Sequence, residues 1–196
     1  MRKFDDPNLR FEHASGRAIA DVYTEELHQL YLAVWERAKY RLEKLPAEFF
    51  RDIGRRFADQ ASMTLVRCKE RPVAFVFGIW EGSAYHNLYC GLDYELNDRI
   101  DLYFNLYYHE LDRLMRAGAR LVHMGQTSDE FKARLGATPE PLWFAVRATN
   151  PLVHRGLRTF SKWIFPPVLK TPQRQVFRIG PAPRKTKALR EPASTP

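Results

Sequence analysis

The stretch Pro72-Val-Ala-Phe-Val-Phe-Gly-Ile-Trp80 is apolar throughout, a pattern typical of a strand that is buried on both faces of a sheet. Residues 63–68 before it alternate in polarity, and residues 84–92 after it form a third extended stretch. Short turns at Glu70-Arg71 and Glu81-Gly82-Ser83 separate the three stretches. Together they predict an antiparallel meander.

Helical patterns flank this meander. Apolar residues recur every three to five positions from Ile19 to Leu42, and a second helix is expected to restart at Pro46 and fade near Asp59. After the meander, Asn97-Asp98 is expected to cap a long helix that runs from Arg99 to Ala117. The first 17 residues are polar, so we expect them to be irregular with at most a short extended piece.

The remaining sequence predicts strands at 120–124 and 141–146, helices at 129–135 and 150–165, and a strand-like piece at 175–179. The fold class is therefore α/β with a mixed sheet: N-terminal helices, the meander, a β-α-β-α-β half and a basic C-terminal helix. The expected organisation is an irregular N-terminus (1–17), one domain (18–149), a basic amphipathic helix (150–165) and a Pro-rich basic tail (166–196).

The charge is distributed unevenly over the 196 residues. The formal net charge is +8, but residues 1–149 contribute −1 and residues 150–196 contribute +9. A hydrophobic content of 45% excludes wholesale disorder, and two cysteines cannot form a disulfide scaffold. No targeting segment is evident, and the longest apolar run is about half of the ~20 residues that a membrane span needs. We expect a cytoplasmic protein; peripheral attachment to the inner face of a membrane stays open.

Four collinear segments carry a resemblance to a known family. They are Leu45-Pro-Ala-Glu-Phe-Phe50, Arg71-Pro-Val-Ala-Phe75, Leu88-Tyr-Cys-Gly-Leu-Asp93 and Phe131-Lys-Ala-Arg-Leu-Gly-Ala137. With the element order, they resemble the Gcn5-related N-acetyltransferase (GNAT) fold. Within it they are similar to the Fem-like proteins of bacteria and to the BioF2-like, or CelD-like, acetyltransferase domain. The resemblance spans roughly residues 19–146 and fits the second of the two domains that such relatives commonly carry.

This resemblance implies an acyl- or aminoacyl-transferase domain that transfers an acyl group to an amine. The alternative is a non-catalytic GNAT-shaped interaction module, docked to a membrane or an acidic partner through its basic C-terminus. A partner half-domain supplied elsewhere would complete the usual pair. The acyl donor, the acceptor and the oligomeric state stay open.

Three residues are candidate catalytic groups. By resemblance, Lys132 lies near the reaction centre and stabilises negative charge that develops during acyl transfer. Asp93 belongs to the Gly-Leu-Asp stretch that the family shares. His123 stands where the family often has an aspartate, and an imidazole there could act as a general base. Each has a structural alternative: a solvated lysine, a turn cap and a half-buried strand histidine.

A second group of residues is expected to bind substrate. In the GNAT fold the third strand of the meander lines the acyl site, and its exposed backbone pairs with the pantetheine arm of the donor. Period two places Tyr85, Asn87 and Tyr89 on one face of that strand. Gln126 and Thr127 lie in a polar turn that follows the strand carrying His123.

The expected cofactor is acetyl-CoA or another acyl donor, although the sequence lacks a phosphate-binding loop. Gly91 is followed by Leu-Asp-Tyr-Glu-Leu-Asn-Asp98, which puts three carboxylates where a phosphate would approach. No metal is expected, since the histidines and cysteines show no ligand spacing. The helix at 150–165 is expected either to pack on its own domain or to lie on an anionic membrane surface. Sequence-specific nucleic-acid binding is not expected.

Overall fold

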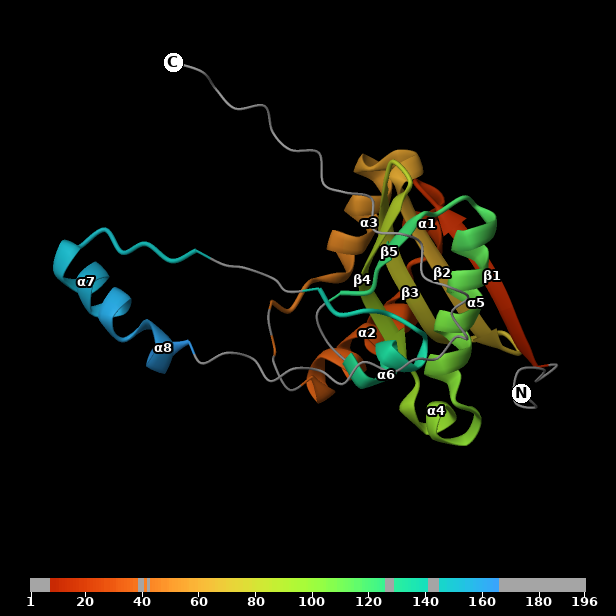
Figure 1. The fold of residues 1–196 in the computed structure, drawn as a ribbon. Coiled ribbons are helices and arrows are strands. Elements are labelled where there is room, and N and C mark those ends of the chain that lie inside the picture. The colour runs from red at the N-terminus through yellow and green to blue at the C-terminus, as the bar shows by residue number, and fades with distance from the viewer. Residues whose placement is uncertain (1–7, 39–40, 42, 126–128, 141–144, 166–196) are drawn as a thin grey trace, which may run out of the picture. The chain divides into compact units, whose positions relative to one another are not determined.

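A computed structural model describes residues 8–38, 41, 43–125, 129–140 and 145–165. The chain divides into two compact units, residues 1–127 and 128–196. The first unit contains a five-stranded sheet in the order β1-β2-β3-β4-β5 (Figure 1). Its strands are β1 (Leu9–Ser15), β2 (Ala61–Cys68), β3 (Arg71–Glu81), β4 (Ala84–Leu92) and β5 (Leu121–His123).

Strand β3 is the apolar stretch from which the fold was predicted, and it lies in the middle of the sheet. β1 to β4 pair in antiparallel fashion, whereas β5 pairs parallel with β4. The mixed sheet, with helices before and after the meander, confirms the predicted α/β fold class.

Helices cover both faces of this sheet. The helices of the first unit are α1 (Ala18–Val22), α2 (Glu25–Arg37), α3 (Ala47–Arg56), α4 (Tyr94–Ile100) and α5 (Leu102–Arg116), with a 3-10 turn η1 (Ala58–Gln60). Met63 and Leu65 of β2 point into the main aromatic core formed with α1 to α3. The alternate residues Ser62 and Thr64 bond to side chains of α5 on the opposite face. The sheet is therefore the middle layer of three.

The structure differs from the sequence prediction at both ends of the meander. The first residues contain a full edge strand, β1, which pairs with β2 along its whole length. Asp93, rather than Asn97-Asp98, caps the first helix after β4, so α4 begins at Tyr94. That helix ends at Asp101, whose left-handed backbone (φ 52°) separates α4 from α5. The Asn97 side chain then accepts a bond from the Tyr103 N–H of α5, at 2.8 Å.

The second unit contains α6 (Asp129–Arg134), α7 (Pro151–Thr159) and α8 (Ser161–Ile164). The strand predicted at 141–146 lies mostly outside the described residues, and Ala145 and Val146 are in no strand. The strand-like piece at 175–179 also lies outside them. Within the part of the chain that the structure describes, no helix is long and apolar enough to cross a membrane.

Candidate functional site

The edge of β4 that faces β5 is only partly paired. β5 matches β4 at Ala84, Tyr85 and His86 alone, although β4 continues to Leu92. Among the described residues no strand pairs with the edge beyond His86. Because β4 runs beside β3 on its other side, its outer edge here is a place where an extended ligand can pair.

A β-bulge lies at the start of this open edge. The register of β3 with β4 shifts from Phe77↔Tyr89 to Gly78↔Asn87, which leaves Leu88 as the extra residue. A bulge reverses the side-chain alternation of the strand that carries it. The predicted common face for Tyr85, Asn87 and Tyr89 is therefore wrong.

The bulge sends these three side chains to two faces. Tyr85 is buried against the α5 side, where its hydroxyl lies 3.4 Å from the Ser62 carbonyl oxygen. Asn87 is also buried. Tyr89 instead lies on the α1 to α3 side and makes edge contacts with Tyr31 and the Phe49 ring. Sequence periodicity missed the split because a bulge adds a residue without changing the residue types around it.

Asn87 has an amide without a hydrogen-bond partner in the described structure. Its side chain is 6% exposed, and both its Nδ2 and Oδ1 atoms are buried and unbonded. A buried amide that makes no hydrogen bond costs about 1–3 kcal/mol. Such a group beside an open strand edge is suited to donate to, and accept from, a bound molecule.

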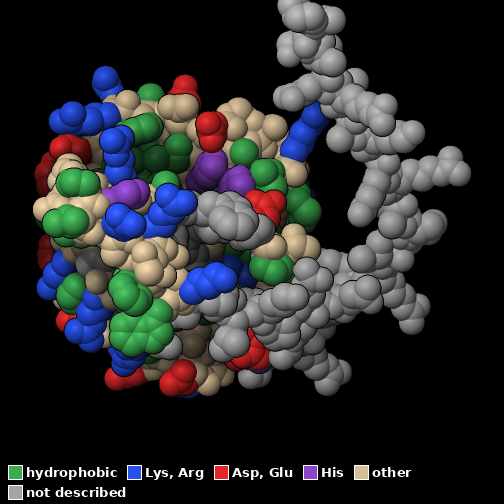
Figure 2. All heavy atoms as spheres, turned by 60° about the vertical axis from the view of Figure 1, so that its left-hand side comes forward, with side chains coloured by type: hydrophobic (Ala, Val, Ile, Leu, Met, Phe, Trp, Pro, Cys, Tyr) green, Lys and Arg blue, Asp and Glu red, His purple; other side chains and the backbone are tan. Residues whose placement is uncertain are grey.

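His123 of β5 lies against a second histidine, His86 of β4. Their rings are stacked, with centroids 4.5 Å apart and planes 16° from parallel, and Figure 2 shows histidine side chains adjoining one another at the surface. Nε2 of His86 lies 3.0 Å from Oε2 of Glu81. The pairing of His86 with His123 and the role of Glu81 could not be predicted from the sequence, because only the parallel pairing of β5 brings His86 next to His123.

A pocket of about 330 Å³ adjoins this histidine pair and the bulge. It is lined by Phe57, Gln60, Ile79, Trp80, Glu81, His86 and Leu88. Most of this wall is apolar, and its polar groups include the imidazole of His86, the carboxylate of Glu81 and the amide of Gln60. A neutral amine with an apolar substituent would find both contact area and a proton acceptor there.

Asp93 lies at the end of β4 and is held by two partners. Its carboxylate accepts a bond from the Leu96 N–H at 3.0 Å, which makes it the N-cap of α4, and it pairs with Arg71 at 2.5 Å. Burial raises the pKa of this carboxyl, but the bonds from Leu96 and Arg71 lower it more, so its pKa is below the ordinary 3.8. Asp93 is thus a carboxylate at neutral pH and does not readily accept a proton.

The other predicted site residues lie elsewhere. Lys132 is on α6, in the second unit, whereas Asp93 and His123 are in the first. Gln126 and Thr127 fall outside the described residues. The structure therefore brings His123 together with His86, a pairing that had not been predicted, and leaves the roles of Lys132, Gln126 and Thr127 as predictions.

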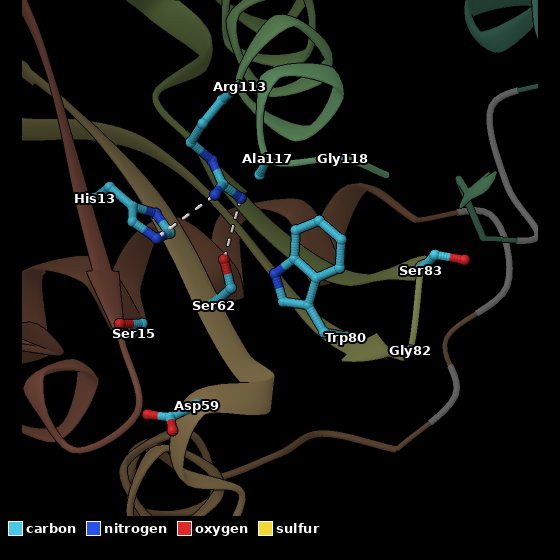
Figure 3. Close-up of a pocket in the computed structure, with 10 residues that line it drawn as sticks. All are labelled: His13, Ser15, Asp59, Ser62, Trp80, Gly82, Ser83, Arg113, Ala117 and Gly118. Carbon is cyan, nitrogen blue, oxygen red and sulfur yellow. Dashed lines mark hydrogen bonds between the residues drawn. The ribbon is translucent and has the colours of Figure 1, made fainter. Parts of the chain in front are cut away.

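A second, larger pocket opens on the α5 side of the sheet (Figure 3). It measures about 530 Å³, and the side chains of Arg113, His13, Ser62 and Trp80 point toward it. The Arg113 guanidinium donates to Ser62 Oγ at 3.1 Å and to the buried carboxylate of Glu110 at 2.7 Å. Burial, and then the Arg113 charge, lower the pKa of His13, so its ring is neutral at pH 7.

These contacts give Arg113 a structural role. The Glu110 carboxylate, which is completely buried, also accepts a bond from the Thr64 hydroxyl at 2.6 Å. The cluster thus joins α5 to β2 by bonds that satisfy a buried charge. Of the described residues, no group of three or more His, Cys, Asp or Glu side chains is placed to hold a metal ion.

The chain belongs to the family described as the acetyltransferase (GNAT) domain, whose pattern matches residues 1–133. Its fold is similar to that of aminoglycoside acetyltransferase meta-AAC0020 from an uncultured soil metagenomic sample, solved with sisomicin: 11% identity, TM-score 0.52, covering 74% of this chain and 99% of that one. It also resembles aminoglycoside acetyltransferase HMB0005 from a similar source: 14% identity, TM-score 0.50, covering 72% and 99%. No curated protein matches the sequence.

Proposed function

We propose that this chain is an N-acyltransferase that moves an acyl group from a thioester of the coenzyme A class to an amine. The observation that carries the proposal is the open edge of β4 beyond His86, with a bulge at Leu88 and the unpartnered Asn87 amide beside it. In a chain that belongs to the GNAT acetyltransferase family, this edge is the expected binding site for the acyl donor.

The donor would lie along β4 as a substitute strand. The arm of a pantetheine thioester contains amides, which can exchange hydrogen bonds with a strand edge as a neighbouring strand would. The phosphates of the donor would gain little binding energy at the N-terminus of α4. Asp93 already accepts a hydrogen bond there, and Glu95 adds a second negative charge. Most of the donor affinity is therefore assigned to the arm.

The acceptor amine would enter the pocket beside the histidine pair. Its nitrogen attacks the thioester carbonyl carbon, so that a C–N bond forms and the C–S bond breaks. The sulfur leaves as a thiolate and takes up a proton from solvent. His86, oriented by Glu81 and stacked on His123, accepts the proton that the amine loses. Glu81 stabilises the imidazolium that results.

Lys132 and Asp93 complete this proposal in different roles. Lys132 would stabilise the negative charge that develops on the carbonyl oxygen, as the sequence resemblance implies. Asp93 acts through α4, whose first turn it fixes, and is a positioning residue rather than a proton carrier. Gln126 and Thr127, which follow His123 in the sequence, would contact the acceptor.

Thiol release tests the proposal. Purified protein is mixed with acetyl-CoA and a panel of primary amines, and the free thiol is measured over time. His86→Gln and His123→Gln should lower kcat roughly 100-fold or more. His154→Gln, an exposed histidine on α7, is the matched control and should leave kcat unchanged. Equal rates for all four proteins would contradict the assignment of the histidines.

A parallel measurement identifies the donor. Acetyl-pantetheine has the amide arm without the nucleotide, so it should retain most of the kcat/KM of acetyl-CoA if the arm provides the affinity. A transferase of the Fem-like type would instead use an aminoacyl ester of tRNA. Activity with that donor alone would assign the protein to the Fem-like type.

A non-catalytic GNAT-shaped module is the second candidate function. The carboxylate of Asp93 favours it, because it occupies the helix N-terminus where an anionic donor would otherwise be held. Failure of every thioester and aminoacyl ester to release its acyl group to any amine would favour this candidate over the transferase.

A further inference from the structure

The pair of helices α7 and α8 exposes most of its large apolar side chains. Neither helix buries any residue. Trp163 is 86% exposed and Leu152 is 79% exposed, and the other strongly exposed apolar residues are Val153, Phe160, Ile164 and Phe165. An isolated exposed leucine is ordinary. Six exposed large apolar side chains within fourteen residues instead indicate an interaction surface.

Helix α8 follows α7 directly, with Phe160 between them as the C-cap of α7 and the N-cap of α8. The Phe160 N–H bonds to the Gly156 carbonyl at 2.9 Å, and the Phe160 carbonyl accepts from the N–H groups of Trp163 and Ile164 at 3.0 and 2.9 Å. The backbone at Phe160 (φ −100°, ψ 11°) departs from helical values, so α8 does not continue the axis of α7. Side-chain directions are therefore compared within α7, at about 100° per residue.

Viewed down this axis, the apolar and basic side chains separate. The apolar ones fall within an arc of about 140°, and the basic ones fall within a separate arc of about 60°. The apolar arc of α7 contains Leu152, Val153 and Leu157, and its basic arc contains Arg155 and Arg158; Lys162, Trp163 and Ile164 follow on α8. Residues 145–165 contain four basic and no acidic side chains.

From this arrangement we infer that α7 and α8 dock the protein on an anionic phospholipid surface. The helix pair would lie in the plane of the interface with its apolar side chains in the acyl region and its basic side chains among the lipid phosphates. Trp163 suits that depth, because an indole has an apolar body and a polar N–H.

The apolar side chains decide between a membrane and another polyanion. A nucleic acid or an acidic protein tail would neutralise Arg155, Arg158 and Lys162 but would leave Trp163 and Leu152 in water. A bilayer satisfies both kinds of side chain together. The inference is independent of the proposed transferase activity, since it uses only residues of α7 and α8.

Vesicle co-sedimentation of the full-length chain tests the inference. The probes are vesicles of phosphatidylcholine alone and vesicles in which a third of the lipid is phosphatidylglycerol. The parent protein should bind the anionic vesicles much more tightly, and 0.5 M salt should weaken that binding. A parent protein that binds neither vesicle would overturn the inference.

Two variants and a control separate the contributions of the apolar and the basic side chains. The double variant Phe160→Ser/Trp163→Ser should weaken partitioning at least tenfold, and Arg158→Gln should weaken it about fivefold. Met115→Ser removes a comparably exposed apolar side chain from α5 and should change nothing. The basic tail at 166–196 is intact in all of these proteins, so it cannot account for a difference between them.

Trp163 fluorescence provides an independent readout. Its emission should shift to the blue on binding anionic vesicles, and the shift should be absent from the Trp163→Ser variant. Two results would show that the apolar side chains are not inserted. One is that the Phe160→Ser/Trp163→Ser protein sediments as the parent does, and the other is that heparin, a soluble polyanion, shifts the Trp163 emission of the parent as far as the vesicles do. Either result would reject the membrane in favour of a soluble polyanion.

Discussion

Asp93 belongs to two local structures at once: it ends β4 and begins α4. The same carboxylate accepts from the Leu96 N–H and pairs with Arg71, which stands at the start of β3. One side chain thus fixes the angle at which the chain leaves the sheet. The ion pair is largely solvent-exposed on the Arg71 side, so we assign most of the stabilisation to the cap.

Replacing Asp93 by alanine should lower the free energy of unfolding by about 1 kcal/mol, measured by urea denaturation at pH 7. Because the folded-state pKa is lowered, the stabilisation is complete above the ordinary pKa of 3.8 and is lost as the pH falls through the folded-state value. The parent and Asp93→Ala proteins should therefore converge in stability in acid. A difference that persists below pH 2 would show that packing, rather than the carboxylate charge, is lost.

Asn87 allows function to be separated from stability. Asn87→Leu removes the buried, unbonded amide, so the free energy of unfolding should stay the same or rise by about 1 kcal/mol. If the amide binds the donor, KM for the thioester should rise roughly threefold or more. Thermal melting and thiol-release kinetics on one protein sample give both numbers. A destabilised variant with unchanged KM would mean that Asn87 is only a core residue.

At the scale of elements, the bulge in β4 organises the site. It turns Tyr89 toward the aromatic core, keeps Asn87 on the α5 side and places Leu88 at the rim of the pocket that also contains His86. Gly78 of β3 lies opposite the bulge. A Cβ at Gly78 would come within 2.4 Å of the His86 carbonyl oxygen and 2.6 Å of the Tyr85 ring.

We expect Gly78→Ala to lower the free energy of unfolding by about 1–3 kcal/mol and to reduce activity more than stability alone explains. The added methyl group can be accommodated only if β4 moves away from β3, which displaces His86 from Glu81. Denaturant unfolding and thiol release measured at 15 °C, where the variant stays folded, would reveal both effects. Gly156→Ala is the control: a Cβ there meets no atom within 4 Å, so the first unit should melt as before.

The elements also show which features the sequence can predict. The runs at 72–80 and 84–92 became β3 and β4 because strand patterns are local, and turn residues mark their ends. The break at Asp101 was missed because a non-glycine residue in the left-handed region has no strong sequence signal. The His86–His123 pair was missed for another reason: its two halves are 37 positions apart, and only the parallel pairing of β5 joins them.

At the scale of the whole molecule, charge is divided unevenly along the chain. Figure 2 shows acidic and basic side chains interspersed on one face, consistent with a net charge of −1 over residues 1–149. The sequence predicted this division and the amphipathic pattern of 150–165 directly. It left open whether that helix packs or docks, because periodicity identifies an apolar face without identifying what covers it. The separation of apolar from basic side chains on α7 is the basis for proposing docking.

An open strand edge also exposes the protein to pairing with other chains. The backbone of β4 beyond His86 is a template on which an extended segment of another molecule can add a strand, the first step of many aggregates. The bulge at Leu88 and the charge of Asp93 at the two ends of this edge shorten the length available for such pairing. A thioester donor bound along this edge would block the addition of a strand from another chain. The substrate would then reduce aggregation as well as react.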